Sequence, residues 1–247
     1  SYFFIALGSG ITFDARGFGA TATFTVADPL GGTDTISNIE SIGIGGTDYD
    51  DIIYGSEHLT AVPGSSWANQ LTGNGGHDTI YGADDGDYLE GGTGNDLLVA
   101  GGGADELIGG AGNDDLDGGT GDDIATFYLD PGAVGTLSVV AGTGPDEGKQ
   151  LVILTDGPAV TRIAEITVSG AIVTVTGVNG GATAFGTDTV TNVQQLVFVG
   201  ALGDPTGPAA QSVDVAAVTG VVSDGYLAGA TIFIDENGNG LLDPGEV

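Results

Sequence analysis

Residues 73–126 consist of six consecutive rows of nine residues, with no insertion between rows. The rows read GNGGHDTIY, GADDGDYLE, GGTGNDLLV, AGGGADELI, GGAGNDDLD and GGTGDDIAT. The sixth position is always an aspartate: Asp78, Asp87, Asp96, Asp105, Asp114 and Asp123. The eighth position is always apolar: Ile80, Leu89, Leu98, Leu107, Leu116 and Ala125. A period held this strictly indicates a solenoid, in which each row is one unit that stacks on its neighbours.

Each row predicts a turn followed by a very short strand. The glycine-rich first six residues favour a turn, because glycine readily adopts positive φ and lets backbones approach closely. The last three residues favour a strand whose central, apolar side chain points inward. Two rows then make an 18-residue coil, and stacked coils make two parallel sheets around a thin core. The aspartates of alternate rows would lie above one another, with 78, 96 and 114 on one edge and 87, 105 and 123 on the other.

Two less regular rows precede the repeat. The row at 64–72, GSSWANQLT, has Asn69 in the aspartate column and Leu71 in the apolar column. The row at 45–53, GGTDYDDII, is a more distant variant. We therefore expect a roll over 45–126, regular at 73–126 and degenerate at 45–72.

The charge of the repeat predicts that the bare roll is unstable. Residues 73–126 carry 13 acidic residues and no Lys or Arg. Strands stack about 4.8 Å apart, and two carboxylates roughly 5 Å apart repel by about 3 kcal/mol at an effective dielectric of 20. A divalent cation between adjacent turns would reverse the sign of this interaction. Ca²⁺ suits aspartates and turn carbonyls better than Mg²⁺, which demands a strict octahedron and resists dehydration.

The rows resemble the GGxGxDxUx nonapeptide of the RTX family of calcium-binding β-rolls. The resemblance covers 64–126 closely and 45–63 loosely, and it implies an all-β, calcium-binding parallel β-roll flanked by β-strand caps. It also implies a ligand scheme for about four to five Ca²⁺ ions. The earlier turn offers the carbonyls of positions two and four and its aspartate, and the turn 18 residues later offers the carbonyls of positions one and three and its aspartate.

Carried onto this chain, the scheme gives four sites. The first is Asn74, Gly76, Asp78, Gly91, Thr93 and Asp96, and the second is Ala83, Asp85, Asp87, Ala100, Gly102 and Asp105. The third is Gly92, Gly94, Asp96, Gly109, Ala111 and Asp114, and the fourth is Gly101, Gly103, Asp105, Gly118, Thr120 and Asp123. A fifth site, between the turns of Asn69 and Asp87, is weakened because asparagine lacks charge.

Strand-like segments flank the roll. GTDTISNIESI at 32–42 and GTDTVTNVQQL at 186–196 echo each other and resemble the leader and trailer of RTX repeats, so we expect them to cover the ends of the solenoid. They leave a metal role open for Asp34 and Asp188. We expect an N-terminal β cap over 1–44, an antiparallel β cap over 127–200, a linker at 201–210 and a partial β module over 211–247.

The final segment, IFIDENGNGLLDPGEV, contains a second calcium pattern. Six of its residues fit ligand positions of an EF-hand-type loop: Asp235, Asn237, Asn239, Leu241, Asp243 and Glu246. The preceding GATIFI is strand-like, so the loop resembles the strand-loop calcium sites of bacterial surface-protein modules. A polar turn without a metal is the alternative. We expect one Ca²⁺ here.

No catalytic constellation is evident in the sequence. His58 and His77 lack the neighbours of a zinc site or a triad, and GxSxG does not occur. The nine-residue period already explains the paired carboxylates, so we expect a chain that is not an enzyme. Trp67 favours a cap on the core, with a carbohydrate platform as the alternative.

The amino-acid composition limits the kinds of molecule that this chain is expected to bind. A net charge of −31 opposes binding to nucleic acid, and no apolar run reaches the 18 residues of a membrane span. The chain lacks cysteine, so no disulfide supports it. It starts without Met or a basic segment, so we expect neighbouring domains in a longer chain.

The RTX resemblance implies export by type I secretion machinery to the outside or surface of a Gram-negative bacterium. The leading hypothesis is a calcium-dependent structural segment of an adhesin, S-layer protein or exoprotein. The alternatives are an accessory module of a secreted enzyme (a protease, lipase, epimerase or phosphatase) whose catalytic domain lies elsewhere, and a module that binds surface glycans.

Overall fold

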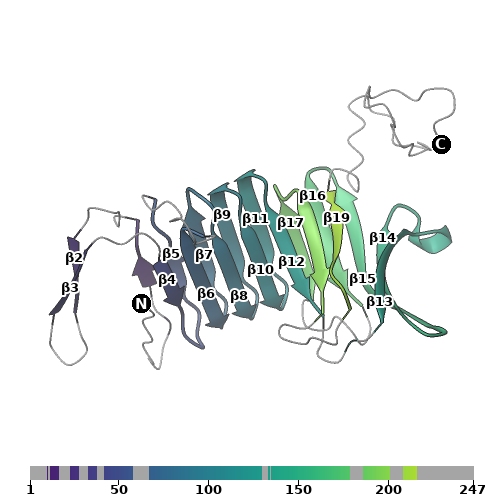
Figure 1. Cartoon of the computed structure of the whole chain (residues 1–247), viewed down its shortest axis with the longest axis horizontal. Coiled ribbons are helices and arrows are strands. Elements are labelled where there is room, and N and C mark those ends of the chain that lie inside the picture. Colours follow the sequence, from purple (N-terminus) through teal and green to yellow (C-terminus); the bar gives the residue numbers. More distant parts are fainter. Residues whose placement is uncertain are drawn as a thin grey trace, which may run out of the picture.

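The computed structural model describes residues 10, 12–16, 23–27, 33–37, 42–57, 67–129, 133, 135–178, 186–200 and 208–215. Its regular structure is almost entirely β-strand, with one short 3₁₀ turn at Gly144–Asp146. Figure 1 shows an elongated stack of strands that runs along the long axis of the molecule. None of the helical residues in the described ranges forms a segment long and apolar enough to cross a membrane.

Two parallel sheets form the body of the stack. The strands of the first sheet are, in spatial order, β1 (Thr12–Asp14), β5 (Ile52–Tyr54), β7 (Thr79–Ala83), β9 (Leu97–Gly103), β11 (Asp115–Gly121) and β17 (Thr187–Thr191). Those of the second are β4 (Ile42–Gly45), β6 (Asn69–Gly75), β8 (Tyr88–Thr93), β10 (Glu106–Ala111), β12 (Ile124–Tyr128) and β18 (Gln195–Val199). From β6 to β12 the chain alternates between the sheets, so two rows make one coil. The predicted parallel β-roll is confirmed.

The register between coils advances by 18 residues, as the period predicts. Leu98 pairs with Ile80 and with Leu116 in one sheet, and Leu89 pairs with Leu71 and with Leu107 in the other. The eighth-position side chains of the six rows are 0–1% exposed and fill the space between the sheets. Since each coil buries only two such side chains, the core of the roll is thin.

The roll begins before the repeat. β1 and β4 already pair in parallel with β5 and β6. In the degenerate row, Ile53 pairs with Ile80 and is fully buried, whereas Ile52 is 40% exposed. The row therefore starts at Gly46 rather than Gly45, and Asp51 rather than Asp50 stands in the aspartate column. Burial of one isoleucine decides this shift, because a one-residue slip moves every side chain of a strand to the other face.

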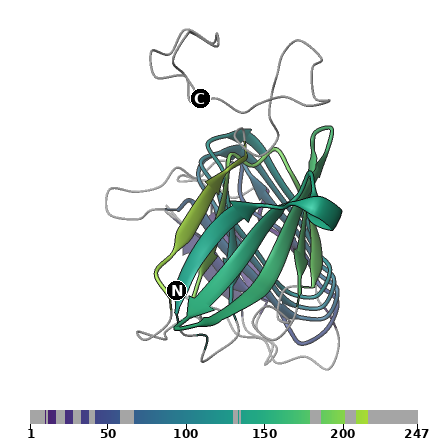
Figure 2. The ribbon, with the colours of Figure 1, turned by 90° about the vertical axis from the view of Figure 1, so that its right-hand side faces the viewer.

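The roll also continues after the last repeat. The segment after the repeat was expected to be wholly antiparallel, but β17 and β18 pair in parallel with β11 and β12. Between β12 and β17 in the sequence, the chain forms an antiparallel series of four strands: β13 (Thr136–Ala141), β14 (Gln150–Asp156), β15 (Ala159–Ser169) and β16 (Ile172–Gly177). β16 pairs antiparallel with β17, and β19 (Gln211–Asp214) pairs antiparallel with β18. Figure 2 shows these antiparallel strands in front of the stacked coils.

The two similar flanking segments, the leader at 32–42 and the trailer at 186–196, lie in different parts of the fold. The trailer supplies β17 and β18 of the roll, whereas in the leader Thr33–Ser37 forms strand β3, which pairs with β2 (Thr23–Ala27) in a separate hairpin. The last residue of the leader, Ile42, begins β4, which pairs with β6 in the roll. The expected boundaries of the flanking segments stay predictions.

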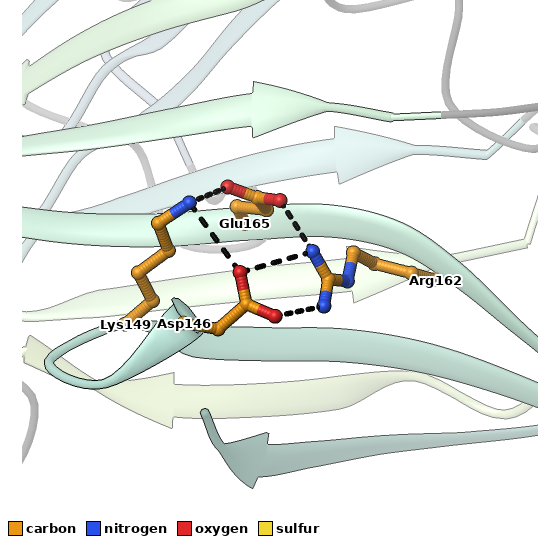
Figure 3. A network of polar contacts seen from close by, with 4 residues as sticks. All are labelled: Asp146, Lys149, Arg162 and Glu165. Atoms are coloured by element: carbon orange, nitrogen blue, oxygen red, sulfur yellow. Dashed lines mark hydrogen bonds and ion pairs between the residues drawn. The ribbon is translucent and has the colours of Figure 1, made fainter. Parts of the chain in front are cut away.

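All three basic residues form ion pairs away from the aspartate columns. Arg16 pairs with Asp14 at 2.6 Å. Lys149 and Arg162 both contact Asp146 and Glu165 in a four-residue network, formed by β15 and the turn between β13 and β14 (Figure 3). Since the chain has only these three Lys and Arg residues, its cations are engaged with acids outside the repeat.

Candidate metal centre

The six repeat aspartates lie inside the turns, not on the surface. Their exposed fractions are between 0 and 3%. The turn that precedes each strand folds the carboxylate back under the backbone of its own row, and in the five rows that begin with glycine an added Cβ on that glycine would collide with the aspartate. The fourth row begins with Ala100. A row with this sequence therefore buries a charge that is normally solvated, and such burial is costly unless the charge is paired.

One carboxylate oxygen of each aspartate is held by the backbone of the coil before it. The N–H of Asp78 donates to Oδ1 of Asp96 at 2.8 Å, and the N–H of Asp96 donates to Oδ1 of Asp114 at 2.9 Å. We name this series the Asp78 ladder, and it consists of Asp51, Asp78, Asp96, Asp114 and Asp188. On the other edge the Asp87 ladder consists of Asn69, Asp87, Asp105, Asp123 and Gln194.

The second carboxylate oxygen has no hydrogen-bond partner among the described residues. This holds for Oδ2 of all six repeat aspartates and of Asp188. Leaving a buried charged acceptor unsatisfied costs more than a neutral group would. Seven such atoms in two columns indicate sites for a cation rather than scattered defects.

Backbone carbonyls lie beside these orphaned oxygens. A Cβ placed on Gly73 would be 2.1 Å from Asp78 Oδ2 and 2.5 Å from the carbonyl of Gly91, so these two oxygens line one small space. The same arrangement recurs one coil later around Gly91, with Asp96 Oδ2 at 2.3 Å and the Gly109 carbonyl at 2.6 Å. The expected position-one carbonyl of the later turn thus adjoins the aspartate of the earlier turn.

The other expected carbonyl ligands also lie between adjacent turns. The carbonyls of Asn74 and Gly76 point at the next coil, where Cβ atoms on Gly92 and Gly94 would come within 2.2 and 1.6 Å of them. The Thr93 carbonyl accepts the N–H of Gly76 at 2.9 Å and keeps a second lone pair. Asn74, Ala83 and Asp85 adopt positive φ in these turns, at 79°, 102° and 65°. In the row that starts Gly-Ala, backbone strain therefore falls on residues 83 and 85.

The carboxyls are poised for a cation. Burial, reinforced by neighbouring carboxylates, raises the pKa of Asp78, Asp87, Asp105 and Asp114 to about 7. Burial also raises the pKa of Asp96 and Asp123. The pKa rises because removing water from a carboxyl group disfavours its charged form. Within the described ranges, no three His, Cys, Asp or Glu side chains converge on one point. A cation here would rely on two carboxylates plus carbonyls, an all-oxygen set that suits Ca²⁺.

Asn69 weakens the expected fifth site. Its Nδ2 donates to Asp87 Oδ1 at 2.8 Å and to the Gly82 carbonyl at 3.1 Å, and its Oδ1 accepts the N–H of Ser56 at 3.0 Å. The amide thus occupies the Gly82 carbonyl, which is the position-one carbonyl of the later turn, and adds a donor beside Asp87, whose Oδ2 stays unpartnered among the described residues. The expected C-terminal loop, with Asp235, Asn237, Asn239, Leu241, Asp243 and Glu246, lies outside the described residues.

Three members of the ladders were absent from the expected ligand set. Asp51 is 1% exposed and accepts the N–H of Thr47 at 2.5 Å on Oδ2. Asp188 is fully buried, and Gln194 accepts the N–H of Asp123 at 2.6 Å. Asp51 lies 27 residues before Asp78, which is three rows of nine, so the period does give it the sixth position, but an 18-residue coil would put it on the other edge. The period does not reach Asp188, because the 74 residues between Asp114 and Asp188 are not a whole number of rows. The GTDT echo around Asp188 was the available signal.

Comparison with known proteins agrees with this geometry. The family model of the RTX calcium-binding nonapeptide repeat (4 copies) matches residues 64–98 and 90–125. No curated protein matches the chain. Repeats of this family bind Ca²⁺, the ion that the oxygen donors favour. The repeat segment of this chain therefore belongs to the RTX calcium-binding nonapeptide family and forms a parallel β-roll.

Proposed function

We propose that this chain is a non-enzymatic structural segment of a larger secreted or cell-surface protein, and that its roll folds only when Ca²⁺ binds between the turns. The observation that carries the proposal is the double column of buried Oδ2 atoms without partners. The three basic residues are paired elsewhere, so the protein itself supplies no countercharge to the columns.

The four expected sites are proposed to hold one Ca²⁺ each. An ion that binds only the folded state adds about 2.7 kcal/mol at a hundredfold excess over its Kd. Four ions would then add roughly 10 kcal/mol, which is comparable to the whole stability of an ordinary domain. Because the core of the roll is thin, this contribution decides whether the roll folds at all.

Such a switch suits a protein exported by type I secretion from a Gram-negative bacterium. At low intracellular calcium the segment would stay unfolded and could be threaded through a secretion channel. At the higher calcium concentration outside, it would fold and hinder return. We place it in an adhesin, S-layer protein or exoprotein, because the ion sites of the roll serve folding rather than chemistry.

The experiment is a calcium titration of the chain followed by circular dichroism, with Mg²⁺ at the same ionic strength as the control. We expect a chelated chain without the β signal of the roll, recovery of that signal with Ca²⁺, and no recovery with Mg²⁺. Hydrogen exchange then locates the change. Full amide protection of residues 73–126 in the chelated chain at neutral pH and low salt would overturn the proposal.

A further inference from the structure

The Asp78 ladder does not stop at the last repeat. The N–H of Asp114 donates to Oδ1 of Asp188 at 2.9 Å, which matches the bond from Asp96 to Asp114. The carbonyl of Asp114 accepts the N–H of Thr189 at 2.8 Å, as the carbonyl of Asp96 accepts that of Asp115 at 2.8 Å. Asp188 thus takes the sixth position of a further row, although 74 residues lie between it and Asp114.

The residues just before Asp188 also stack as a repeat turn does. The N–H of Thr187 donates to Asn113 Oδ1 at 2.8 Å, and one coil earlier the N–H of Asn113 donates to Asn95 Oδ1 at 2.9 Å. A Cβ on Gly186 would lie 2.0 Å from the Gly112 carbonyl, as one on Gly112 would lie 1.6 Å from the Gly94 carbonyl. The Gly112 carbonyl therefore points at the junction between the two turns.

The carboxylate at this junction is unsatisfied. Asp188 is fully buried, and its Oδ2 has no hydrogen-bond partner in the described part of the chain. Oδ2 of Asp114 is in the same state. Burial, with the nearby Asp114 carboxylate, raises the pKa of Asp188 to about 8. The other end of this ladder differs, since Thr47 satisfies Asp51 through its N–H and its hydroxyl.

We infer that Asp114, Asp188 and the Gly112 carbonyl bind a further Ca²⁺ ion, which fastens the C-terminal sheet to the roll. The inference rests on the proposed calcium-dependent folding, because it extends the same ladder beyond the repeat. It assigns a metal ligand role to a residue outside the nonapeptide repeats. The ion would join two segments that are remote in sequence, whereas the expected repeat sites join adjacent coils.

The Asp87 ladder ends differently. There the sixth position is Gln194, whose neutral amide accepts the N–H of Asp123. A cation at that end would meet one carboxylate instead of two. We therefore place the junction ion on the edge of Asp188 only.

The position of β17 determines which part of the structure an ion at Asp188 would stabilise. β17 contains Asp188, pairs in parallel with β11 of the last repeat and pairs antiparallel with β16 (Figure 1). It is the strand through which the antiparallel series β13–β16 meets the roll. An ion at Asp188 would make the docking of this series depend on calcium as well.

The test compares Asp188→Asn with wild type and with Asp156→Asn, which removes the same charge from an exposed site on β14. Asparagine keeps an oxygen for the Asp114 N–H, as Asn69 does for Ser56 in the other ladder. We expect Asp188→Asn to bind one Ca²⁺ fewer by native mass spectrometry. Its β17 amides should exchange faster in calcium while those of β7 and β9 stay protected. Unchanged stoichiometry and exchange in Asp188→Asn would overturn the inference.

A second measurement does not depend on a variant. Anomalous diffraction from calcium-grown crystals of the wild-type chain should show an ion between Asp114 and Asp188. Ions in the repeat turns with none at this junction would overturn the inference alone. Repeat turns without any ion would overturn the proposed function as well.

Discussion

Asn69 Nδ2 donates to Asp87 Oδ1 at 2.8 Å, so an amide N–H stands against a carboxylate at the start of the Asp87 ladder. From Asp87 to Asp123 the side chains that follow one another along this ladder are carboxylates, and Gln194 ends it. The chain thus contains two ways to stabilise a buried aspartate. At one end of the ladder a side-chain N–H donates to the carboxylate, and beyond it a column of carboxylates needs a cation.

Asn69→Asp should replace the side-chain hydrogen-bond donor at the start of the Asp87 ladder with a carboxylate that needs a cation. It removes the donor from Asp87 Oδ1 and adds a buried carboxylate, so we expect the variant to bind one more Ca²⁺ and to need more calcium to fold. Native mass spectrometry gives the stoichiometry, and circular dichroism gives the calcium midpoint. The control is Asn95→Asp, which adds the same charge at an exposed residue in the fifth position of its row. An aspartate is already accommodated in the equivalent place of an earlier row, where Asp50 accepts the His77 N–H. Equal behaviour of the two variants would contradict the prediction.

Asp96→Asn should weaken the centre of the Asp78 ladder. Asp96 is expected to serve two neighbouring sites, so its loss should remove at least one ion. With free calcium about a hundredfold above the Kd, each lost ion lowers the free energy of unfolding by about 2.7 kcal/mol. Urea unfolding in calcium measures the change, and Asp115→Asn, which alters an exposed neighbour, is the control. A loss no larger than that of the control would show that Asp96 is not a shared ligand.

Acid should partly replace calcium. Each carboxyl with a folded-state pKa of about 7, against 3.8 when free, takes up protons on folding between these pH values. The calcium-free fold is therefore most stable below about pH 4 and loses stability as the pH rises toward 7. We expect a calcium-free chain to have more roll structure at pH 5 than at pH 8, measured by circular dichroism and hydrogen exchange.

Calcium should reverse this dependence, because protons compete with the ion for the same oxygens. In the calcium-loaded chain, stability should fall as the pH drops from 7 to 5. A calcium-free chain that is more structured at pH 8 than at pH 5 would mean that these carboxyls are not buried together.

Gly91→Ala should block the space between two oxygens. Its Cβ would lie 2.3 Å from Asp96 Oδ2 and 2.6 Å from the Gly109 carbonyl, so the methyl group would enter the space that these two oxygens line. We expect a loss of calcium affinity together with about 1–3 kcal/mol from overpacking. Gly45→Ala is the control, because its Cβ would have its nearest neighbour at 3.8 Å. Wild-type calcium affinity in Gly91→Ala would place the ion elsewhere.

The sequence by itself determined the roll, its coil length and the two columns over 73–126. A strict period forces equivalent residues into equivalent places, so Leu98 must lie above Ile80 and Asp96 above Asp78. The need for a cation followed equally directly, since the repeat contains 13 acids and no base.

Only the tertiary structure decided where the columns begin and end. The period of nine reaches back to Asp51, but only the structure places Asp51 on the edge of Asp78, and the partner of Asp114 depends on the return of the chain after 74 residues. Spacing along the chain cannot give either result, because an insertion breaks the 18-residue coil and strand pairing across it depends on which side chains are buried. The same return gives one ladder the carboxylate of Asp188 and the other the amide of Gln194.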